Sequence, residues 1–159
     1  MKSERKYSLL EAKARLEALC AYQERCSFEL IKKMNQWSID REDQDRLLAE
    51  LISSNFLSEE RYAEAFTSGK IRIKRWGRIK IRTELKRKMI SNYSIEKAFK
   101  EIDLDEYWNN LVHLAERKWE ASSKEKDDYK RKAKVYRYLS SKGYETDLIK
   151  DAVEEVSKP

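Results

Sequence analysis

The sequence predicts an all-α protein built from three tandem three-helix repeats. Its 159 residues include only three Gly and a single Pro, which is the last residue. So few turn-forming residues cannot punctuate a many-stranded sandwich or barrel. Charged residues make up 40% of the chain and apolar residues another 40%, with four Trp, nine Tyr and four Phe. This balance is typical of a folded, largely helical protein that can bury a core.

The first repeat is predicted over residues 1–55. Ser8 can cap a helix in which Glu11 completes a capping box, Ser27 starts a second helix, and Asp40 can cap a third. After each start, apolar residues recur at the spacing of one helical face. These residues are Leu9, Ala12, Leu16, Leu19, Cys20, Phe28, Leu30, Ile31, Met34, Leu47, Leu48, Leu51 and Ile52.

The second repeat is predicted over residues 56–102. Ser58 can cap its first helix, and the acidic residues that follow interact favourably with the helix dipole. Ser94 can cap its third helix. The apolar face of the repeat consists of Tyr62, Phe66, Gly69, Ile73, Ile81, Leu85, Met89, Ile95, Ala98, Phe99 and Ile102.

The third repeat is predicted over residues 103–159, with a long first helix, a charged connection and two further helices. A shift of 54 residues lays it on the second repeat. The matching pairs are Ile81 and Val135, Leu85 and Leu139, Lys88 and Lys142, Ile90 and Tyr144, Ile95 and Ile149, Ala98 and Ala152, and Phe99 and Val153. A fixed period of this kind is typical of repeat proteins, in which stacked units bury one another's apolar faces.

The stretch IRIKRWGRIKIRT, residues 71–83, alternates apolar and basic residues on both sides of Trp76 and Gly77. Such alternation around a glycine is typical of a β-hairpin, so a basic β-ribbon is one alternative. A lone two-stranded hairpin is marginal in water, however, and the flanking helical faces enter and leave the stretch in phase. We therefore predict a turn between two helices, in which Gly77 ends a helix or supplies a positive φ.

The net charge of +6 comes from the middle of the chain. Residues 1–55 hold ten basic and ten acidic side chains, residues 56–102 hold thirteen and six, and residues 103–159 hold twelve and thirteen. A local excess of this kind is either a solvated helix face or a surface that binds a polyanion or an acidic protein. The predicted contacts are Lys70, Lys74, Arg75, Trp76, Arg78, Lys80, Arg82, Lys86 and Arg87. The cations suit phosphates or carboxylates, whereas Trp76 either stacks on a base or packs over the helix joint.

Several classes of site lack support in the sequence. Cys20, Cys26 and the single His113 do not make a zinc site, so no metal is expected, and Cys20 is predicted to be a core residue. Without a glycine-rich phosphate loop, a Cys–His pair or a Ser–His–Asp set, we expect no catalytic residue and no cofactor. No apolar run is long enough to span a bilayer or to form a signal peptide, so we expect a cytoplasmic protein without membrane contact.

The run FLSEERYAEAFTSGKIRIKRWGRIKIRTELKRKMI, residues 56–90, resembles the central signature of the RecX family, bacterial regulatory proteins of the RecA recombinase. Residues 27–34 and 138–149 resemble the first and third repeats of that family, and the resemblance extends from about residue 9 to residue 156. The signature positions present are Phe56, Leu57, Ser58, Glu59, Arg61, Tyr62, Ala63, Phe66, Lys70, Lys74, Gly77, Ile81, Glu84, Leu85, Lys88 and Ile90.

The chain departs from the family pattern at two places. Ser58-Glu59 stands where many members have two Asp, which puts in doubt any partner contact made by an acid at position 58. Met89 replaces the glycine of a Lys-Gly-Ile motif. Arg61 has two interpretations: it either pairs with an acidic residue of its own helix or contacts a partner.

The resemblance implies three-helix repeats in an elongated, curved arrangement. It also implies a regulator that binds the RecA filament and single-stranded DNA, and double-stranded DNA as a further ligand. Such a regulator inhibits strand exchange and ATP hydrolysis by RecA and modulates DNA repair and recombination. We expect it to be a monomer without enzymatic activity of its own.

Two other functions fit the residues. A helix-turn-helix or non-sequence-specific DNA-binding protein unrelated to RecA is one, although the predicted helix at residues 78–89 offers Lys and Arg but no Asn or Gln toward base edges. A helical-repeat adaptor that binds only proteins is the other, and it predicts negligible affinity for DNA.

Overall fold

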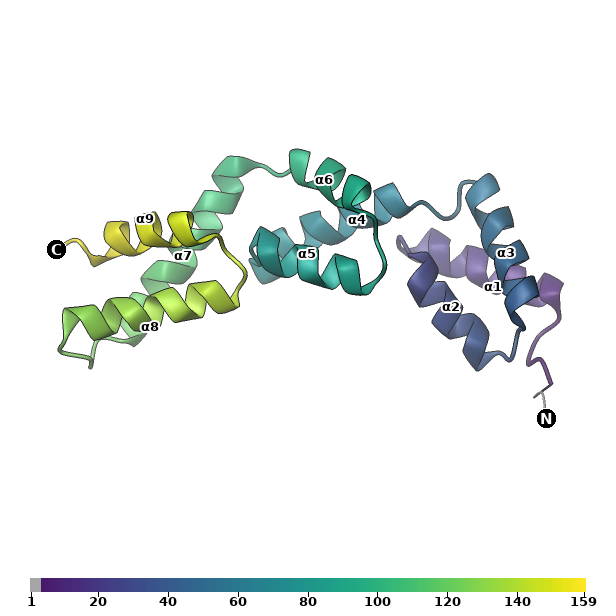
Figure 1. The fold of residues 1–159 in the computed structure, drawn as a ribbon, viewed down its shortest axis with the longest axis horizontal. Helices are drawn as coiled ribbons and strands as arrows, with labels where there is room; N and C mark the ends of the chain where they lie inside the picture. The colour runs from purple at the N-terminus through teal and green to yellow at the C-terminus, as the bar shows by residue number, and fades with distance from the viewer. Residues whose placement is uncertain (1–3) are drawn as a thin grey trace.

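The computed structural model describes residues 4–159 and is helical throughout that range, without a strand (Figure 1). Its helices form three groups that follow one another along the long axis of the molecule. The two ends of the chain lie at opposite ends of this row. The predicted all-α class and the elongated row of three-helix units are therefore confirmed. Residues 1–3 of the predicted first unit lie outside the described part.

Each group contains three helices, and the first and third helices of a group contact each other. The first unit contains α1 (Leu9–Tyr22), α2 (Ser27–Gln36) and α3 (Arg41–Ser53). The second contains α4 (Glu59–Gly69), the π-helical turn η1 (Lys70–Lys74), α5 (Arg78–Arg87) and α6 (Asn92–Lys100). The third contains α7 (Leu104–Ala121), α8 (Asp128–Ser141) and α9 (Thr146–Ser157).

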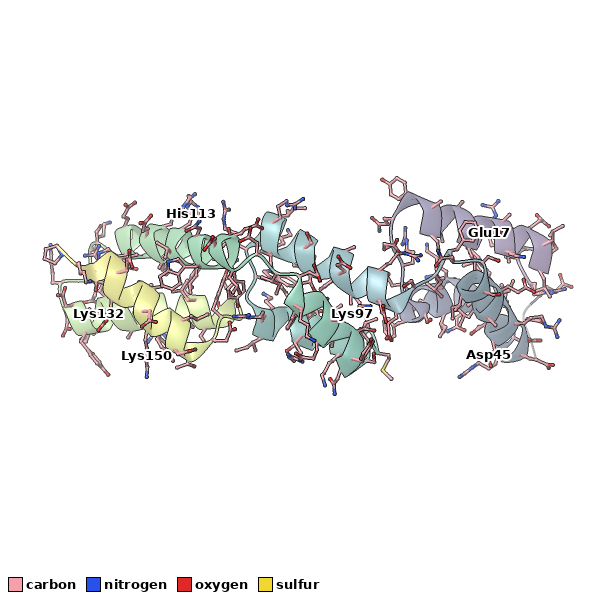
Figure 2. All side chains as sticks on the ribbon, turned by 90° about the horizontal axis from the view of Figure 1, so that it is seen from above. Glu17, Asp45, Lys97, His113, Lys132 and Lys150 are labelled. Atoms are coloured by element: carbon pink, nitrogen blue, oxygen red, sulfur yellow. The ribbon has the colours of Figure 1, made fainter. Side chains whose placement is uncertain are left out.

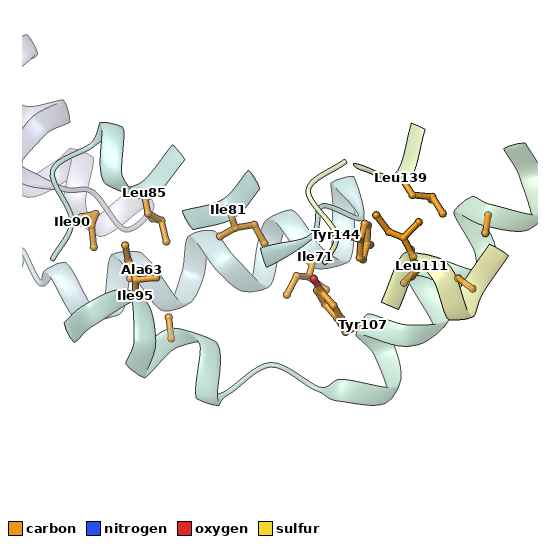
Figure 3. Close-up of a cluster of buried hydrophobic side chains, with 14 of the residues drawn as sticks. Ala63, Ile71, Ile81, Leu85, Ile90, Ile95, Tyr107, Leu111, Leu139 and Tyr144 are labelled. Carbon is orange, nitrogen blue, oxygen red and sulfur yellow. The ribbon is translucent and has the colours of Figure 1, made fainter. Parts of the chain in front are cut away.

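The buried apolar residues form two clusters, although there are three units. One cluster lies in the first unit and includes Leu16, Met34 and the predicted core residue Cys20. The other cluster runs through both the second and the third units, from Tyr62 to Val153, and also includes Cys26 of the first unit (Figure 3). The second and third units therefore share one hydrophobic core, whereas the first unit has a largely separate core.

The second helix of every unit ends in the same way. A residue in the left-handed conformation follows the C-cap: Ser38 with φ 56°, Met89 with φ 63° and Gly143 with φ 93°. The next residue then donates its N–H to the carbonyl five positions earlier, at 3.1, 3.1 and 3.4 Å in the three units. This is the Schellman motif. It aligns the first unit with the other two at a joint where their sequences differ.

The helix starts follow the predicted caps with one exception. The side chains of Ser8, Asp40 and Ser58 each accept a hydrogen bond from the first turn of their helix, as predicted. The prediction that Ser94 caps the third helix of the second unit is wrong, because α6 begins earlier and Ser91 is its cap. Ser94 is a buried residue inside the first turn.

The basic stretch at residues 71–83 contains no strand, so the β-ribbon alternative is wrong. The chain leaves η1, turns at Trp76 and enters α5, which confirms the predicted joint between helices. The predicted backbone role of Gly77 is wrong, however. The left-handed residue is Arg75, with φ 53°, whereas Gly77 has φ −85° and is the extended N-cap of α5.

Gly77 is needed because two backbones meet there. A Cβ on Gly77 would lie 2.3 Å from the carbonyl oxygen of Gly143, and a Cβ on Gly143 would lie 2.4 Å from the Cβ of Lys80. The approach is stabilised by hydrogen bonds, since the Gly77 N–H donates to the Lys142 carbonyl at 2.8 Å and the Ile79 N–H to the Gly143 carbonyl at 2.9 Å. The second and third units are thus joined backbone to backbone.

Gly77→Ala should therefore destabilise the protein by about 2 kcal/mol, because overpacking that only backbone movement can relieve typically costs 1–3 kcal/mol. Gly69→Ala is the matched control: its φ of −64° is helical and its Cβ would meet nothing within 4 Å. The control should leave stability unchanged or raise it. Urea denaturation of both variants checks this, and equal midpoints would contradict the proposed role of the close approach.

Met89→Gly should raise the free energy of unfolding by about 1 kcal/mol, because a left-handed non-glycine residue is strained and glycine is not. Met89 is 76% exposed, so little packing is lost. The control is Ile79→Gly, which removes another exposed apolar side chain but lies within α5 and should cost about 1 kcal/mol. Thermal denaturation of the two variants should shift the midpoint in opposite directions.

Candidate functional site

The nine predicted binding residues differ in the partners that their side chains have. Arg78, Arg82 and Arg87 are each paired with a carboxylate. Trp76 is half-buried. The remaining five cations have no carboxylate partner among residues 4–159, and they are Lys70, Lys74, Arg75, Lys80 and Lys86. The surplus positive charge of the second unit therefore lies in these five side chains together with Arg72 and Lys100, which also have no carboxylate partner among the described residues.

Arg78 lies at the joint between the second and third units. Its Nε is 2.7 Å from a carboxylate oxygen of Glu145, and its backbone N–H donates to the Tyr107 hydroxyl at 2.9 Å. That hydroxyl donates in turn to Glu145. Burial lowers the pKa of Arg78, but the Glu145 carboxylate and Tyr107 outweigh burial and leave the pKa raised. Burial and then the hydrogen bond to Glu145 raise the pKa of Tyr107. This network stabilises the joint.

Arg82 and Arg87 are each paired with a carboxylate inside the second unit. Arg82 pairs with Glu96 and so connects α5 to α6, and its guanidinium lies 5.0 Å from the centre of the Phe99 ring. Arg87 pairs with Glu84, one turn away in α5, at 3.1 Å. The Arg87 pair is exposed, and exposed pairs contribute little to stability. Arg87 can therefore exchange its partner for a ligand more readily than Arg82.

Trp76 packs over the helix joint. Its ring meets Phe66 edge-on, with the ring centres 6.5 Å apart, and borders the core shared by the second and third units. The ammonium groups of Lys70 and Lys80 lie 4.8 and 4.6 Å from the ring centre. This packing accounts for Trp76 without a stacked base. It also brings two cations that lack a carboxylate partner in the described range against one ring.

Lys74 and Lys86 are exposed, one at the end of η1 and the other in the last turn of α5. Arg75 is half-buried and lines a cavity with His113 and Arg117 of α7 in the third unit. We divide the five cations into two groups: the lysines of the second unit, called the lysine surface below and consisting of Lys70, Lys74, Lys80 and Lys86, and Arg75 at the joint.

Arg61 of the signature has a structural partner that the sequence did not reveal. The prediction that it pairs within its own helix is wrong, because its Nε lies 3.0 Å from Glu24 and its other nitrogens donate to Asn55. Both partners belong to the first unit. Arg61 thus connects the first and second units, and a partner 37 residues away leaves no signal in helical spacing.

Glu59, another signature residue, also acts inside the fold. Its carboxylate accepts hydrogen bonds from the hydroxyls of Ser91 and Ser94 at 2.8 and 2.7 Å, which fixes the start of α6 against the start of α4. Beside it, Ser58 accepts from the backbone N–H of Arg61 and caps α4. The acidic start of the signature therefore has a structural explanation.

Residues 4–159 contain no group of three or more His, Cys, Asp or Glu side chains that could hold a metal ion. Cys20 and Cys26 are both buried, and burial raises the pKa of each thiol. No helix in the described range is long and apolar enough to cross a bilayer. The surface cations therefore remain the main candidates for binding.

Two family models match the chain. The model of the second three-helix domain of RecX matches residues 58–98, and that of the third three-helix domain matches residues 105–153. The first of these ranges contains the lysine surface and Arg75. The second contains the other residues that line the cavity at the joint.

Curated relatives named regulatory protein RecX are similar to the chain. The protein of Clostridium botulinum strain Eklund 17B is 36% identical over 77% of this chain and 58% of its own length. The chain thus spans less than two thirds of that relative. The protein of Pseudomonas savastanoi pv. phaseolicola is 33% identical, and the match covers 82% of both chains.

Solved structures share the fold. The crystal structure of RecX from Lactobacillus salivarius superimposes with a TM-score of 0.82 at 20% identity, covering 93% of this chain and 96% of that one. A second crystal structure of regulatory protein RecX gives 0.80 at 22% identity over 90% of this chain. From its successive RecX domains and its relatives above 30% identity, we conclude that the chain belongs to the RecX family of regulatory proteins.

Proposed function

We propose that this protein binds the RecA–single-stranded DNA filament and inhibits the strand exchange and ATP hydrolysis of RecA. The observation that carries the proposal is the family membership, since the relatives that match most of the chain are named regulatory protein RecX. On this proposal the protein acts in the cytoplasm as a monomer, through binding and without catalysis of its own. Its effect is to modulate DNA repair and recombination.

The elongated row of units supports the proposal. An extended surface can contact several neighbouring subunits of a filament at once, and each added contact raises the overall affinity. The shared core of the second and third units holds their surfaces in a fixed relation. The lysine surface then offers cations to DNA phosphates, or to carboxylates on RecA, without requiring a base sequence.

A second candidate is DNA binding without RecA. It is favoured by the four lysines of the lysine surface, which have no carboxylate partner among residues 4–159 and would bind single-stranded and double-stranded DNA alike through phosphates. The absence of a paired carboxylate at these lysines speaks against a purely structural role for their charge.

Titration of the protein into a RecA strand-exchange reaction should slow exchange at or below the molar amount of RecA, together with ATP hydrolysis on single-stranded DNA. The reason is that a protein bound along the filament hinders ATP turnover by RecA and also prevents the second DNA from reaching the filament. ATP hydrolysis should be absent when RecA is omitted. If exchange and hydrolysis proceed unchanged at a stoichiometric amount, the RecA proposal fails and DNA binding alone becomes the better account.

Lys74→Gln with Lys86→Gln should weaken DNA binding and reduce the slope of log affinity against log salt by about 1.4, since each phosphate contact of a single strand contributes about 0.7. Arg82→Gln with Lys97→Gln is the matched control, because it removes the same charge from the same unit. Its two cations are already paired with Glu96 and Glu60.

Fluorescence anisotropy with a labelled oligodeoxythymidylate across a salt series measures both slopes. The control pair should change the slope by much less than the Lys74/Lys86 pair, because removing a cation that is already paired releases few counterions. Equal reductions would mean that total charge, and not the lysine surface, determines binding.

A further inference from the structure

We propose that a cavity between the second and third units binds a backbone phosphate of single-stranded DNA. The cavity has a volume of about 330 Å³ and is lined by Arg75, Leu114 and Ala121 together with four polar residues of the third unit. The polar residues are His113, Arg117, Lys118 and Tyr138. This inference deepens the DNA-binding part of the proposed function. It places a phosphate contact outside the lysine surface.

The charge of the lining favours an anion. Three of its seven residues are cations, Arg75, Arg117 and Lys118, and none is acidic. None of these cations has a carboxylate partner within residues 4–159. By contrast, Arg61 and Arg78 at the joints between units are each paired with a carboxylate. Like charges that face one cavity without a counterion repel one another, and a bound anion would remove that repulsion.

Arg75 is held in place by the joint itself. Its carbonyl accepts a hydrogen bond from the buried Tyr144 hydroxyl at 2.8 Å, and its backbone takes the left-handed conformation. Its Nε is buried without a hydrogen-bond partner in the described part of the chain. A buried guanidinium N–H that lacks a partner is costly. Since Arg75 also lines the cavity, an anion bound there would stabilise its charge. The strained backbone thus presents a preorganised donor.

The other donors come from different elements. His113 and Arg117 lie one helical turn apart on α7, and Lys118 directly follows Arg117; all three border the cavity. Tyr138 comes from α8, and the ammonium groups of Lys118 and Lys142 lie 5.2 and 5.6 Å from its ring centre. Donors that converge from three directions suit the tetrahedral oxygens of a phosphate better than the planar end of a carboxylate.

The size and place of the cavity favour a strand of DNA as the source of the phosphate. The volume exceeds what a lone phosphate fills, so part of the attached sugar can enter. Arg75 directly follows Lys74 of the lysine surface in the chain. A flexible single strand could therefore place successive phosphates on the lysine surface and in the cavity, whereas a duplex is too stiff to bend into it.

Arg117→Gln with Lys118→Gln tests the proposal in the full chain. With a labelled oligodeoxythymidylate, these substitutions should weaken binding and lower the salt slope by about 1.4, as two lost phosphate contacts require. The matched control is Lys132→Gln with Lys150→Gln, two exposed cations of the same unit. Figure 2 shows them on the opposite edge of the unit from His113. The control should leave the slope nearly unchanged.

Each result decides the proposal. The proposal is supported if the slope of log affinity against log salt falls only in the Arg117/Lys118 variant. It is overturned if the two double variants have equal slopes. Binding of polyglutamate is a separate test. If polyglutamate binding depends on Arg117 and Lys118 and oligonucleotide binding does not, the cavity binds protein carboxylates and the proposal is wrong. A wild-type chain that binds no oligonucleotide also overturns it.

RecA assays separate this inference from the proposed function. If the cavity plays no part in DNA binding, the wild-type protein still inhibits RecA ATP hydrolysis, but the Arg117/Lys118 variant and its control have the same salt slope. If the proposed function is wrong, the wild-type protein itself leaves ATP hydrolysis unchanged, whatever the cavity binds. Circular dichroism of both double variants should match the wild type, because the substituted side chains lie on the surface and retain helix-forming residues.

Discussion

The close approach of Gly77 and Gly143 is the constraint on which the arrangement of the second and third units depends. Side chains at either position would hold the two backbones apart. Only at this separation can the backbone hydrogen bonds between the units form and Arg78 reach Glu145. The continuous core is a further consequence, because Tyr107 and Tyr144 can then pack with ring centres 5.2 Å apart (Figure 3). One steric requirement thus organises polar and apolar contacts together.

The same joint divides the basic stretch by role. Arg78 neutralises Glu145 inside the joint, and Lys70 and Lys80 gather around Trp76, where the helix turns. Counting charge along the sequence treats these side chains as equivalent. In three dimensions a cation that already has a carboxylate at hydrogen-bonding distance has little to gain from a phosphate, whereas an unpaired one has its full charge to offer. The binding surface is therefore smaller than the basic stretch.

Local rules predicted much of the fold and less of the site. Periodicity and capping gave the three units and starts such as Asp40, because these depend on neighbours within a turn. The error at Ser94 came from choosing between two serines one turn apart, both of which can cap. The role of Gly77 and the partner of Arg61 escaped prediction because each depends on a contact with a distant segment. No spacing along the chain encodes such contacts.

The two joints of the molecule differ in the strength of their connection. The first unit meets the second through side chains, including the pairs of Arg61 with Glu24 and Lys88 with Glu29, and keeps a largely separate core. The second and third units are connected through backbone hydrogen bonds and a common core. A ligand that touches both the lysine surface and the cavity beside Arg75 therefore meets two sites at a fixed separation. The second and third units do not have to be ordered relative to each other when it binds. Such preorganisation increases affinity for a strand of matching phosphate spacing, because little conformational entropy is lost.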